Sequence, residues 1–411
     1  PGAPRHSANP GAASGPPRAA ITRYERLPGA KMQLSTLKNY ILMCVAFSFN
    51  HGSVTAVLNV SVALLGNNGS YMNATLYVMY ALTALLFATA PLELLGARRS
   101  LIVAAALYSI YVIAFPLSLL APPGEPGLDL TIALVAGVVG GFAAGFVWVA
   151  QGKYFSSAAK TYAMEQQISE GEANQTFASI FAFTLLSVEV LLKLFPVALL
   201  PLSGESVVIY PKDRHGDEKA LSLNNLIIAC TYSFTALGAV VLMRFIADVE
   251  AVETSTDPLL EDRSKHKKVT LEKALAAVRL WCTRPTVLLL APIQVTFGVC
   301  AALLGQEVTG TIIPDTYQKD GVIVGSLMGT LVSFTAGVLQ VPTKLLRTRV
   351  GRVPLMLFGL LSFVALALLI LLLTPHEIGM WGALVPIYLL QGFGRSCYEG
   401  INKALYADMF P

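Results

Sequence analysis

The chain has 411 residues, of which 55% are hydrophobic and 13% are charged, whereas soluble domains average about 25% charged residues. This composition excludes an ordinary soluble domain, and the net charge of +4 is spread over loops rather than gathered as in a nucleic-acid-binding surface. Apolar runs of about 20 residues recur from residue 39 almost to the end, which predicts an all-α polytopic membrane protein. The five cysteines have no paired spacing, which argues against a disulfide framework or a zinc site.

Residues 1–38 are rich in Pro, Ala, Gly and Ser and hold six Lys or Arg against one acidic residue, Glu25. This composition predicts a disordered basic tail. Because the first residue is Pro1 rather than Met, we expect a processed or trimmed product. A remnant of an organelle transit peptide is one alternative, since such peptides are basic and poor in acids.

Ten membrane spans are expected after the tail. They are placed at 39–65, 73–95, 100–121, 130–152, 174–200, 223–246, 286–306, 321–343, 354–374 and 379–403. The tail and the loops on its side hold 22 Lys or Arg, against four in the opposite loops. The positive-inside rule therefore places the N-terminus and these loops in the cytoplasm.

The fourth span carries a glycine stripe. Gly137, Gly141 and Gly145 recur every four residues and so share one helical face. Small residues at this spacing let another helix approach closely in a membrane, so we expect this face to pack within the first half of the chain. The same helix ends with Trp148 and Gln151, close to the predicted cytoplasmic interface.

A long loop at 247–285 separates six spans from four. Its second part has Leu271, Leu275, Val278 and Cys282 at helical spacing with basic residues between them, which predicts an amphipathic helix on the membrane surface. The expected organisation is a tail at 1–38, an N-terminal six-helix half at 39–246, a cytoplasmic linker at 247–285 and a C-terminal half at 286–411.

The two halves resemble each other. Short basic turns follow the second and eighth spans at 94–99 and 345–352, and Gly-Phe pairs precede polar ends in the fourth and tenth spans at 145–153 and 392–403. Parallel repeats of six spans are typical of the major facilitator fold, which is the predicted fold. We expect that the last two helices of the second half are missing from this chain.

Three segments carry a family resemblance. The sequence GFVWVAQGKYF at 145–155 resembles the signature of the UNC-93-like family, and 76–115 and 391–410 are similar to its patterns for spans 2, 3 and 10. The resemblance implies a major facilitator fold. It also implies activities that differ among members, since the family is named for a regulatory subunit of a potassium channel and others act in receptor trafficking or ion homeostasis.

Polar residues within the spans are candidates for a central cavity, because burying them in hydrocarbon is costly. His51, in the middle of span 1, either faces the cavity as a substrate or proton group or is a hydrogen-bonded structural histidine. The candidate cavity or transport residues are Asn50, His51, Asn59, Trp148, Gln151, Arg395 and Glu399.

Two ion pairs are expected inside spans. Glu189 and Lys193 are four residues apart in span 5, where they form either a structural pair or a coupling site. Arg395 and Glu399 have the same spacing in span 10 and are the better candidate for a buried pair. The segment GQEVTGTIIP at 305–314 predicts either a broken helix that acts as a gate or simply the end of span 7.

The basic turns between paired spans are candidate gates. In a major facilitator, cations at this position hold the cytoplasmic gate by bonding carboxylates and helix ends. Positive-inside anchoring alone is the alternative. The candidate gate residues are Glu93, Arg98, Arg99, Arg349 and Arg352.

Two functions follow from these patterns. The first is a secondary transporter of a small solute or ion. The second is a non-transporting accessory, regulatory or structural subunit of another membrane protein complex. No phosphate-binding loop, zinc spacing or nucleophile elbow points to an enzyme, and no cofactor is expected. The expected partners are the lipid bilayer and, in the second case, another membrane protein; the plasma membrane or an endomembrane is expected, with a plastid or mitochondrial membrane as the alternative.

Overall fold

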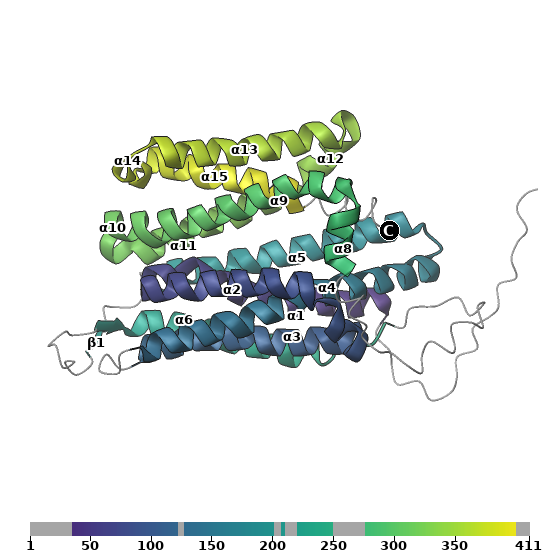
Figure 1. Cartoon of the computed structure of the whole chain (residues 1–411), viewed down its shortest axis with the longest axis horizontal. Helices are drawn as coiled ribbons and strands as arrows, with labels where there is room; N and C mark the ends of the chain where they lie inside the picture. The colour runs from purple at the N-terminus through teal and green to yellow at the C-terminus, as the bar shows by residue number, and fades with distance from the viewer. Residues whose placement is uncertain (1–34, 122–126, 201–206, 210–219, 250–275, 400–411) are drawn as a thin grey trace, which may run out of the picture. The chain divides into compact units, whose positions relative to one another are not determined.

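The computed structural model describes residues 35–121, 127–200, 207–209, 220–249 and 276–399 (Figure 1). Residues 1–34 of the expected basic tail at 1–38 lie outside the described residues, and residues 36–38 are instead the start of the first helix. Residues 250–275 of the linker and the last twelve residues, 400–411, also lie outside the described residues. Within the described part, the expected spans are all occupied by helices.

Six helices form the N-terminal half. They are α1 (Thr36–Leu65), α2 (Asn67–Leu86), α3 (Thr89–Leu120), α4 (Leu128–Gln166), α5 (Glu170–Leu199) and α6 (Leu223–Met243). Buried side chains from all six join in one hydrophobic core. Between α5 and α6, strands β1 (Val207–Ile209) and β2 (Ala220–Ser222) pair antiparallel, with Val207 opposite Ser222.

Most of the remaining helices share a second hydrophobic core. They are α8 (Ala276–Thr283), α9 (Pro285–Leu303), the π-helix η2 (Leu304–Ile312), α10 (Ile313–Tyr317), the 3₁₀ helix η3 (Gln318–Asp320), α11 (Gly321–Val338), α12 (Gln340–Val350), α13 (Arg352–Leu372), α14 (Pro375–Gly379) and α15 (Trp381–Cys397). Figure 1 shows α9, α11, α13 and α15 running side by side, with α11 next to α5 of the N-terminal half.

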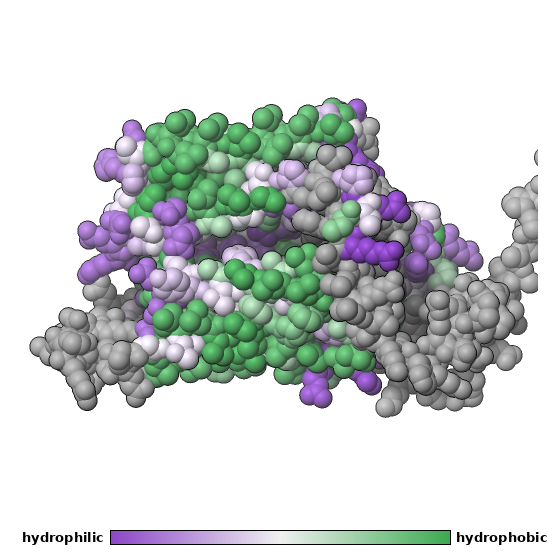
Figure 2. Space-filling view, viewed as in Figure 1, coloured by the Kyte–Doolittle hydropathy of each residue, from purple (hydrophilic) through white to green (hydrophobic). Residues whose placement is uncertain are grey.

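The protein is an integral multi-pass membrane protein. Among the described residues, seven helical stretches are long and apolar enough to cross a membrane. Large apolar side chains point outward from them; Phe183, Phe234 and Leu372 are 75%, 74% and 78% exposed. Figure 2 shows this hydrophobic surface along the lengths of the helices, with hydrophilic residues toward their ends. An apolar surface of this kind is favourable in contact with lipid tails and unfavourable in contact with water.

The glycine stripe of α4 packs directly on α2. A Cβ added at Gly141 would lie 2.6 Å from Met79 Cβ and 2.9 Å from the backbone nitrogen of Tyr80, and one at Gly137 would lie 2.7 Å from the carbonyl oxygen of Met72. Gly145 meets Thr83 and Ala84 of α2 in the same way. The stripe therefore brings two helix backbones together within the first half, as its spacing predicts.

Three local features differ from a simple run of spans. Helix α4 continues to Gln166, well past residue 152 where its span was expected to end. Gly96 has a φ of 76° and bends α3 at the start of the basic turn, a conformation that side chains disfavour. The segment 305–314, which was expected either to break or to end span 7, is a continuous helix whose turns widen to the π form over Leu304–Ile312.

Candidate functional site

A buried ion pair joins the two halves. Arg395 of α15 donates two hydrogen bonds to the carboxylate of Glu189 on α5, from Nη1 to Oε2 at 2.7 Å and from Nη2 to Oε1 at 2.8 Å. The Glu189 side chain is fully buried and that of Arg395 is 12% exposed. This two-pronged geometry is the strongest form of an arginine–carboxylate contact. The two residues are 206 positions apart in the chain.

Three further groups complete the arrangement, which we call the central charge network. Lys193 Nζ lies 3.3 Å from Glu189 Oε2 and donates to Ser333 Oγ of α11 at 3.0 Å. Ser333 Oγ in turn donates to Glu189 Oε2 at 2.9 Å, and Arg395 Nε donates to Glu399 Oε1 at 2.8 Å. Two acids and two bases therefore share one network, so its formal charge is zero.

The network is buried between three membrane helices. Glu189 and Ser333 lie inside α5 and α11, and Arg395 lies in the last turn of α15. Ionised groups that are buried between membrane helices lose their hydration, and each needs an opposite charge or a hydrogen-bonding partner to be tolerated. The mutual pairing of the network supplies these partners and ties α5 to α11 and α15.

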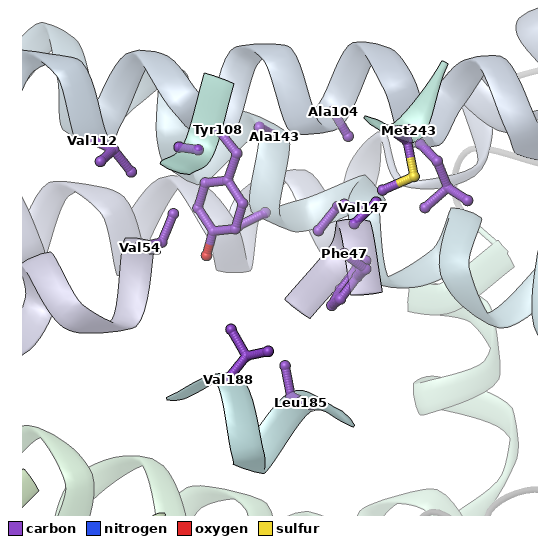
Figure 3. Close-up of a cluster of buried hydrophobic side chains, with 14 of the residues drawn as sticks. Phe47, Val54, Ala104, Tyr108, Val112, Ala143, Val147, Leu185, Val188 and Met243 are labelled. Atoms are coloured by element: carbon purple, nitrogen blue, oxygen red, sulfur yellow. The ribbon is translucent and has the colours of Figure 1, made fainter. Parts of the chain in front are cut away.

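An aromatic cluster lies beside the network. The ring of His51 is 5.0 Å from that of Trp148, 5.8 Å from Phe47 and 5.9 Å from Tyr108, measured between centroids. Phe181 of α5 joins the cluster at 5.4 Å from Phe47. Figure 3 shows Phe47 and Tyr108 extending toward the side of the core where Leu185 and Val188 of α5 lie.

Helices α1 and α5 approach closely where the cluster meets the network. A Cβ added at Gly52 would lie 3.0 Å from Leu192 Cδ1, 3.2 Å from Val188 Cγ1 and 3.9 Å from the backbone nitrogen of Glu189. The half-buried His51 of the aromatic cluster directly precedes Gly52, so the cluster lies next to the segment of α5 that carries Glu189.

The other candidate cavity residues fall in three different environments. Asn50 is 2% exposed and its amide donates to Ser109 Oγ at 2.9 Å and to the Ala105 carbonyl at 3.1 Å, so it joins α1 to α3. Asn59 donates to the Gly325 carbonyl of α11 at 3.3 Å, which is a contact between the halves. Gln151 is buried on α4.

The halves also meet near the end of α1, on the predicted non-cytoplasmic side. Gln306 Nε2 of η2 donates to Ser70 Oγ of α2 at 2.7 Å. Gly310 of η2 packs against Val62 of α1, where an added Cβ would lie 2.7 Å from Val62 Cβ. The π-helical segment thus lies directly on the N-terminal half.

Arg98, among the candidate gate residues, holds the end of α6. Its Nε donates to the Ile246 carbonyl at 2.6 Å, its Nη2 donates to the Arg244 carbonyl at 2.8 Å, and Nη1 lies 3.6 Å from Asp248 Oδ2. A cation at the carbonyl end of a helix satisfies free acceptors and the helix dipole. Arg98 therefore fixes the start of the linker to the N-terminal half.

The remaining candidate gate residues lie in helices: Glu93 and Arg99 in α3, Arg349 in α12, and Arg352 at the start of α13. Arg99 and Arg349 are exposed, while Glu93 and Arg352 are half-buried. Within the part of the chain that the structure describes, no group of three or more His, Cys, Asp or Glu side chains is placed to hold a metal ion.

Sequence reasoning missed the pairing between Glu189 and Arg395. It placed each in a local pair with the residue four positions on, and both local pairs are present. An ion pair with no net charge inside one apolar span does not indicate which other span it packs against. The available signal was that both halves carry such a pair inside a span, where two buried networks can merge into one.

Known proteins resemble this chain in fold. A family model described as Major Facilitator Superfamily matches residues 295–411. The xylose transporter XylE from E. coli, in its inward open conformation, aligns with a TM-score of 0.54 at 14% sequence identity, covering 92% of this chain and 82% of that chain. A partially occluded inward open form of the same transporter gives a TM-score of 0.52 at 13% identity, covering 92% of this chain and 84% of that chain.

The chain has the major facilitator fold. A mutant form of the nucleoside transporter NupG also aligns with this chain, with a TM-score of 0.52 at 9% identity over 91% of this chain and 82% of that chain. No curated protein sequence matches the chain. At these identities the likeness establishes the major facilitator fold, and the UNC-93-like resemblance stays a prediction.

The fold explains where the candidate site lies. In a major facilitator the two six-helix halves meet near the bilayer midplane, where substrate and coupling-ion sites are built. The central charge network lies between helices of the two halves, and the aromatic cluster lies beside it in the N-terminal half. The two features together form the candidate functional site.

Proposed function

We propose that this protein is a secondary transporter of a small solute or ion, in which the central charge network couples the two halves. The observation that carries the proposal is the fully buried carboxylate of Glu189, held across the half boundary by both terminal nitrogens of Arg395. Ionised residues inside a membrane are costly and mark transport pathways by default. Alternating access requires contacts between the halves that form in one state and rearrange in another.

In this proposal, the described structure is a state closed on the predicted non-cytoplasmic side. The contacts of Gln306 with Ser70 and of Asn59 with Gly325 support this assignment, because both lie toward that end of α1. Opening that side requires η2 to separate from α1 and α2. The π-helical turns of η2 favour such movement, since π-helical segments are often found at functional sites.

The finer proposal is an UNC-93-like branch of this fold. The segment GFVWVAQGKYF at 145–155 supports it, since it carries Trp148 of the aromatic cluster and Gln151, which is buried beside it on the same helix. The integral membrane location is common to both functions considered, and the bilayer is the one partner that both require.

Flux measurements in proteoliposomes test the transport proposal. Uptake of D-xylose and uridine, the solute classes named for the structural relatives, is compared with ion currents on a solid-supported membrane. We expect uptake or current for the wild-type protein and a loss of at least ten-fold in Arg395→Gln. Lys160→Gln, an exposed change at the end of α4, is the control and should leave flux unchanged.

An accessory or regulatory subunit is the second candidate. One observation favours it: the central charge network is internally paired and neutral, so it needs no transported ion to balance it. Under this function, wild-type protein gives no flux for any solute or ion tested. The wild-type signal is then no higher than the signal of the Arg395→Gln variant. That result would reject the transporter proposal in favour of the accessory one.

A further inference from the structure

The two halves differ in charge at their predicted cytoplasmic ends. In the C-terminal half, residues 273–306 contain three Lys or Arg, residues 321–376 contain four, and neither stretch contains an Asp or Glu. In the N-terminal half, the cytoplasmic segment 153–172 holds three glutamates beside two lysines. Arg98 of that half also pairs with Asp248, at 3.6 Å from Nη1 to Oδ2. Basic charge is therefore concentrated at the cytoplasmic end of the C-terminal half.

Two short helices carry this charge at one end of the molecule. Arg279 lies on α8 and Arg284 directly precedes α9, and both side chains are exposed. Arg349 is exposed on α12, and Arg352 begins α13. Figure 1 shows α8 and α12 at the same end of the helices, on either side of the start of α9. We call the surface formed by Arg279, Arg284, Arg349 and Arg352 the basic edge.

Helix α12 is fixed at both of its ends. At its start, Gln340 Nε2 donates to the Ser396 carbonyl of α15 at 3.3 Å. After its last residue, Gly351 has a φ of 86°, a left-handed conformation that glycine adopts without strain, and the chain turns there into α13. Arg349 and Arg352 lie on the two sides of this turn. The basic edge is therefore built on anchored helices rather than on a long loop.

Exposed apolar side chains accompany these cations. Leu280 of α8 is 37% exposed, and Val341, Leu345 and Val350 of α12 are 66%, 64% and 47% exposed. Helices that combine exposed apolar residues with arginines are suited to the membrane interface, where the apolar side chains enter the acyl region and the cations reach the headgroups. The combination of apolar and basic side chains favours a lipid partner over a soluble one.

We propose that the basic edge binds anionic phospholipids of the cytoplasmic leaflet. A guanidinium group can bind a phosphate through two parallel hydrogen bonds. A zwitterionic headgroup carries its own cation, so it neutralises the edge less than an anionic headgroup does. Clusters of Lys and Arg beside the cytoplasmic ends of membrane helices attract anionic lipid in this way. The inference does not depend on whether the protein transports a solute.

Native mass spectrometry of the detergent-purified chain tests the preference. The protein is mixed with equal amounts of phosphatidylglycerol and phosphatidylcholine that have the same acyl chains, and the bound copies of each are counted. We expect bound phosphatidylglycerol to exceed bound phosphatidylcholine by about three-fold or more. The excess should shrink when the salt concentration is raised from about 0.1 M to about 1 M, because exposed charges are then screened.

Matched variants locate the preference on the basic edge. The test variant removes three exposed charges of the edge: Arg279→Gln, Arg284→Gln and Arg349→Gln. The control removes three exposed charges from the cytoplasmic end of the N-terminal half: Lys153→Gln, Lys160→Gln and Arg244→Gln. We expect the lipid ratio to fall close to one in the test variant and to stay at the wild-type value in the control. Lysine at the three test positions keeps the charge and should keep most of the preference.

Soluble competitors distinguish a lipid from other anions. Glycerol 3-phosphate carries the phosphate without acyl chains, and a glutamate peptide represents an acidic protein segment. We expect neither to displace phosphatidylglycerol when present at the same concentration as the lipid. Displacement by either competitor, equal binding of the two lipids to the wild-type protein, or equal effects of the test and control variants would overturn the inference. The wild-type comparison holds even if a variant fails to fold.

Discussion

Glu189 is the residue on which the contact between the halves depends. It accepts hydrogen bonds from Arg395, Ser333 and Lys193, which come from α15, α11 and its own helix. Its neutral partner Ser333 belongs to α11, so three helices lose a contact when this carboxylate changes. A buried ion pair that loses one member leaves the other charge uncompensated, and this costs about 3–5 kcal/mol.

Glu189→Gln should therefore destabilise the protein by about 3–5 kcal/mol in its free energy of unfolding. The amide keeps the size of the side chain but leaves Arg395 and Lys193 with only Glu399 to balance them. Unfolding in detergent, followed by circular dichroism, measures the loss. Glu170→Gln, an exposed change in the first turn of the same helix, is the control and should change stability by only a few tenths of a kcal/mol.

Sequence alone identified the local members of this network but not the network itself. The four-residue spacing of Glu189 with Lys193 and of Arg395 with Glu399 is sufficient to predict two neutral pairs on helix faces. Which helices face each other depends on tertiary packing, and Ser333, an ordinary serine in an apolar span, gives no signal of its own. The central pairing of Glu189 with Arg395 could therefore be found only in three dimensions.

Helix α4 shows how much of an element can be predicted from residue spacing. The glycine stripe predicted a close helix contact, and the structure gives α2 as the partner. The identity of the partner helix was not predictable, because any helix with small residues at its surface can pack against the same glycine stripe. The extension of α4 to Gln166 was also missed, since its polar end has no hydrophobic signal of a membrane span.

Gly141→Ala should destabilise the α2–α4 contact by about 1–3 kcal/mol, the usual cost of overpacking a close interface. The new Cβ meets the carbonyl oxygen of Leu76 and would lie 2.9 Å from the backbone nitrogen of Tyr80, and backbone atoms cannot rotate away. Gly152→Ala on the same helix is the matched control, because an added Cβ there has no neighbour within 4 Å. It should be neutral or stabilising, since Ala favours a helix. Equal effects of both changes on thermal unfolding would contradict the packing account.

The short helix α14 provides a pH-dependent element outside the spans. Thr374 donates from its backbone nitrogen and its hydroxyl to Glu377 Oε2, each at 2.8 Å, and these bonds hold the pKa of Glu377 below its usual range. A carboxylate with a lowered pKa stabilises the folded cap above its ordinary pKa of about 4.3. That contribution is lost as the pH falls through the lowered value.

Acidification below about pH 4 should therefore speed amide hydrogen exchange at the start of α14. Exchange is measured by mass spectrometry on peptides that cover residues 373–381, after correction for the intrinsic pH dependence. Glu377→Gln keeps an acceptor but cannot titrate, so its corrected exchange should not change across this range. A wild-type profile as flat as that of the variant would show that the cap does not depend on the charge.

At the scale of the whole molecule, two sets of contacts join the halves at different places. The central charge network joins α5 to α11 and α15, and the contacts of η2 and α11 with α1 and α2 lie toward the predicted non-cytoplasmic side. The six-plus-four division of spans predicted two halves from repeated basic turns and Gly-Phe pairs, and the fold comparisons agree with a major facilitator arrangement. The sequence does not predict the order in which these contacts break, because that order depends on where each contact lies along the helices.

Distance measurements between the halves test the central claim most directly. Spin labels are placed at two exposed positions on the predicted cytoplasmic side, Lys160 of α4 and Arg349 of α12, in protein whose five native cysteines are replaced. Pulsed electron resonance in lipid nanodiscs then gives the distance distribution with and without the solute identified by flux. We predict at least two populations, a shift between them on adding solute, and a redistribution in Arg395→Gln. A single distance that neither the solute nor Arg395→Gln changes would contradict a transporter whose halves move about the central charge network.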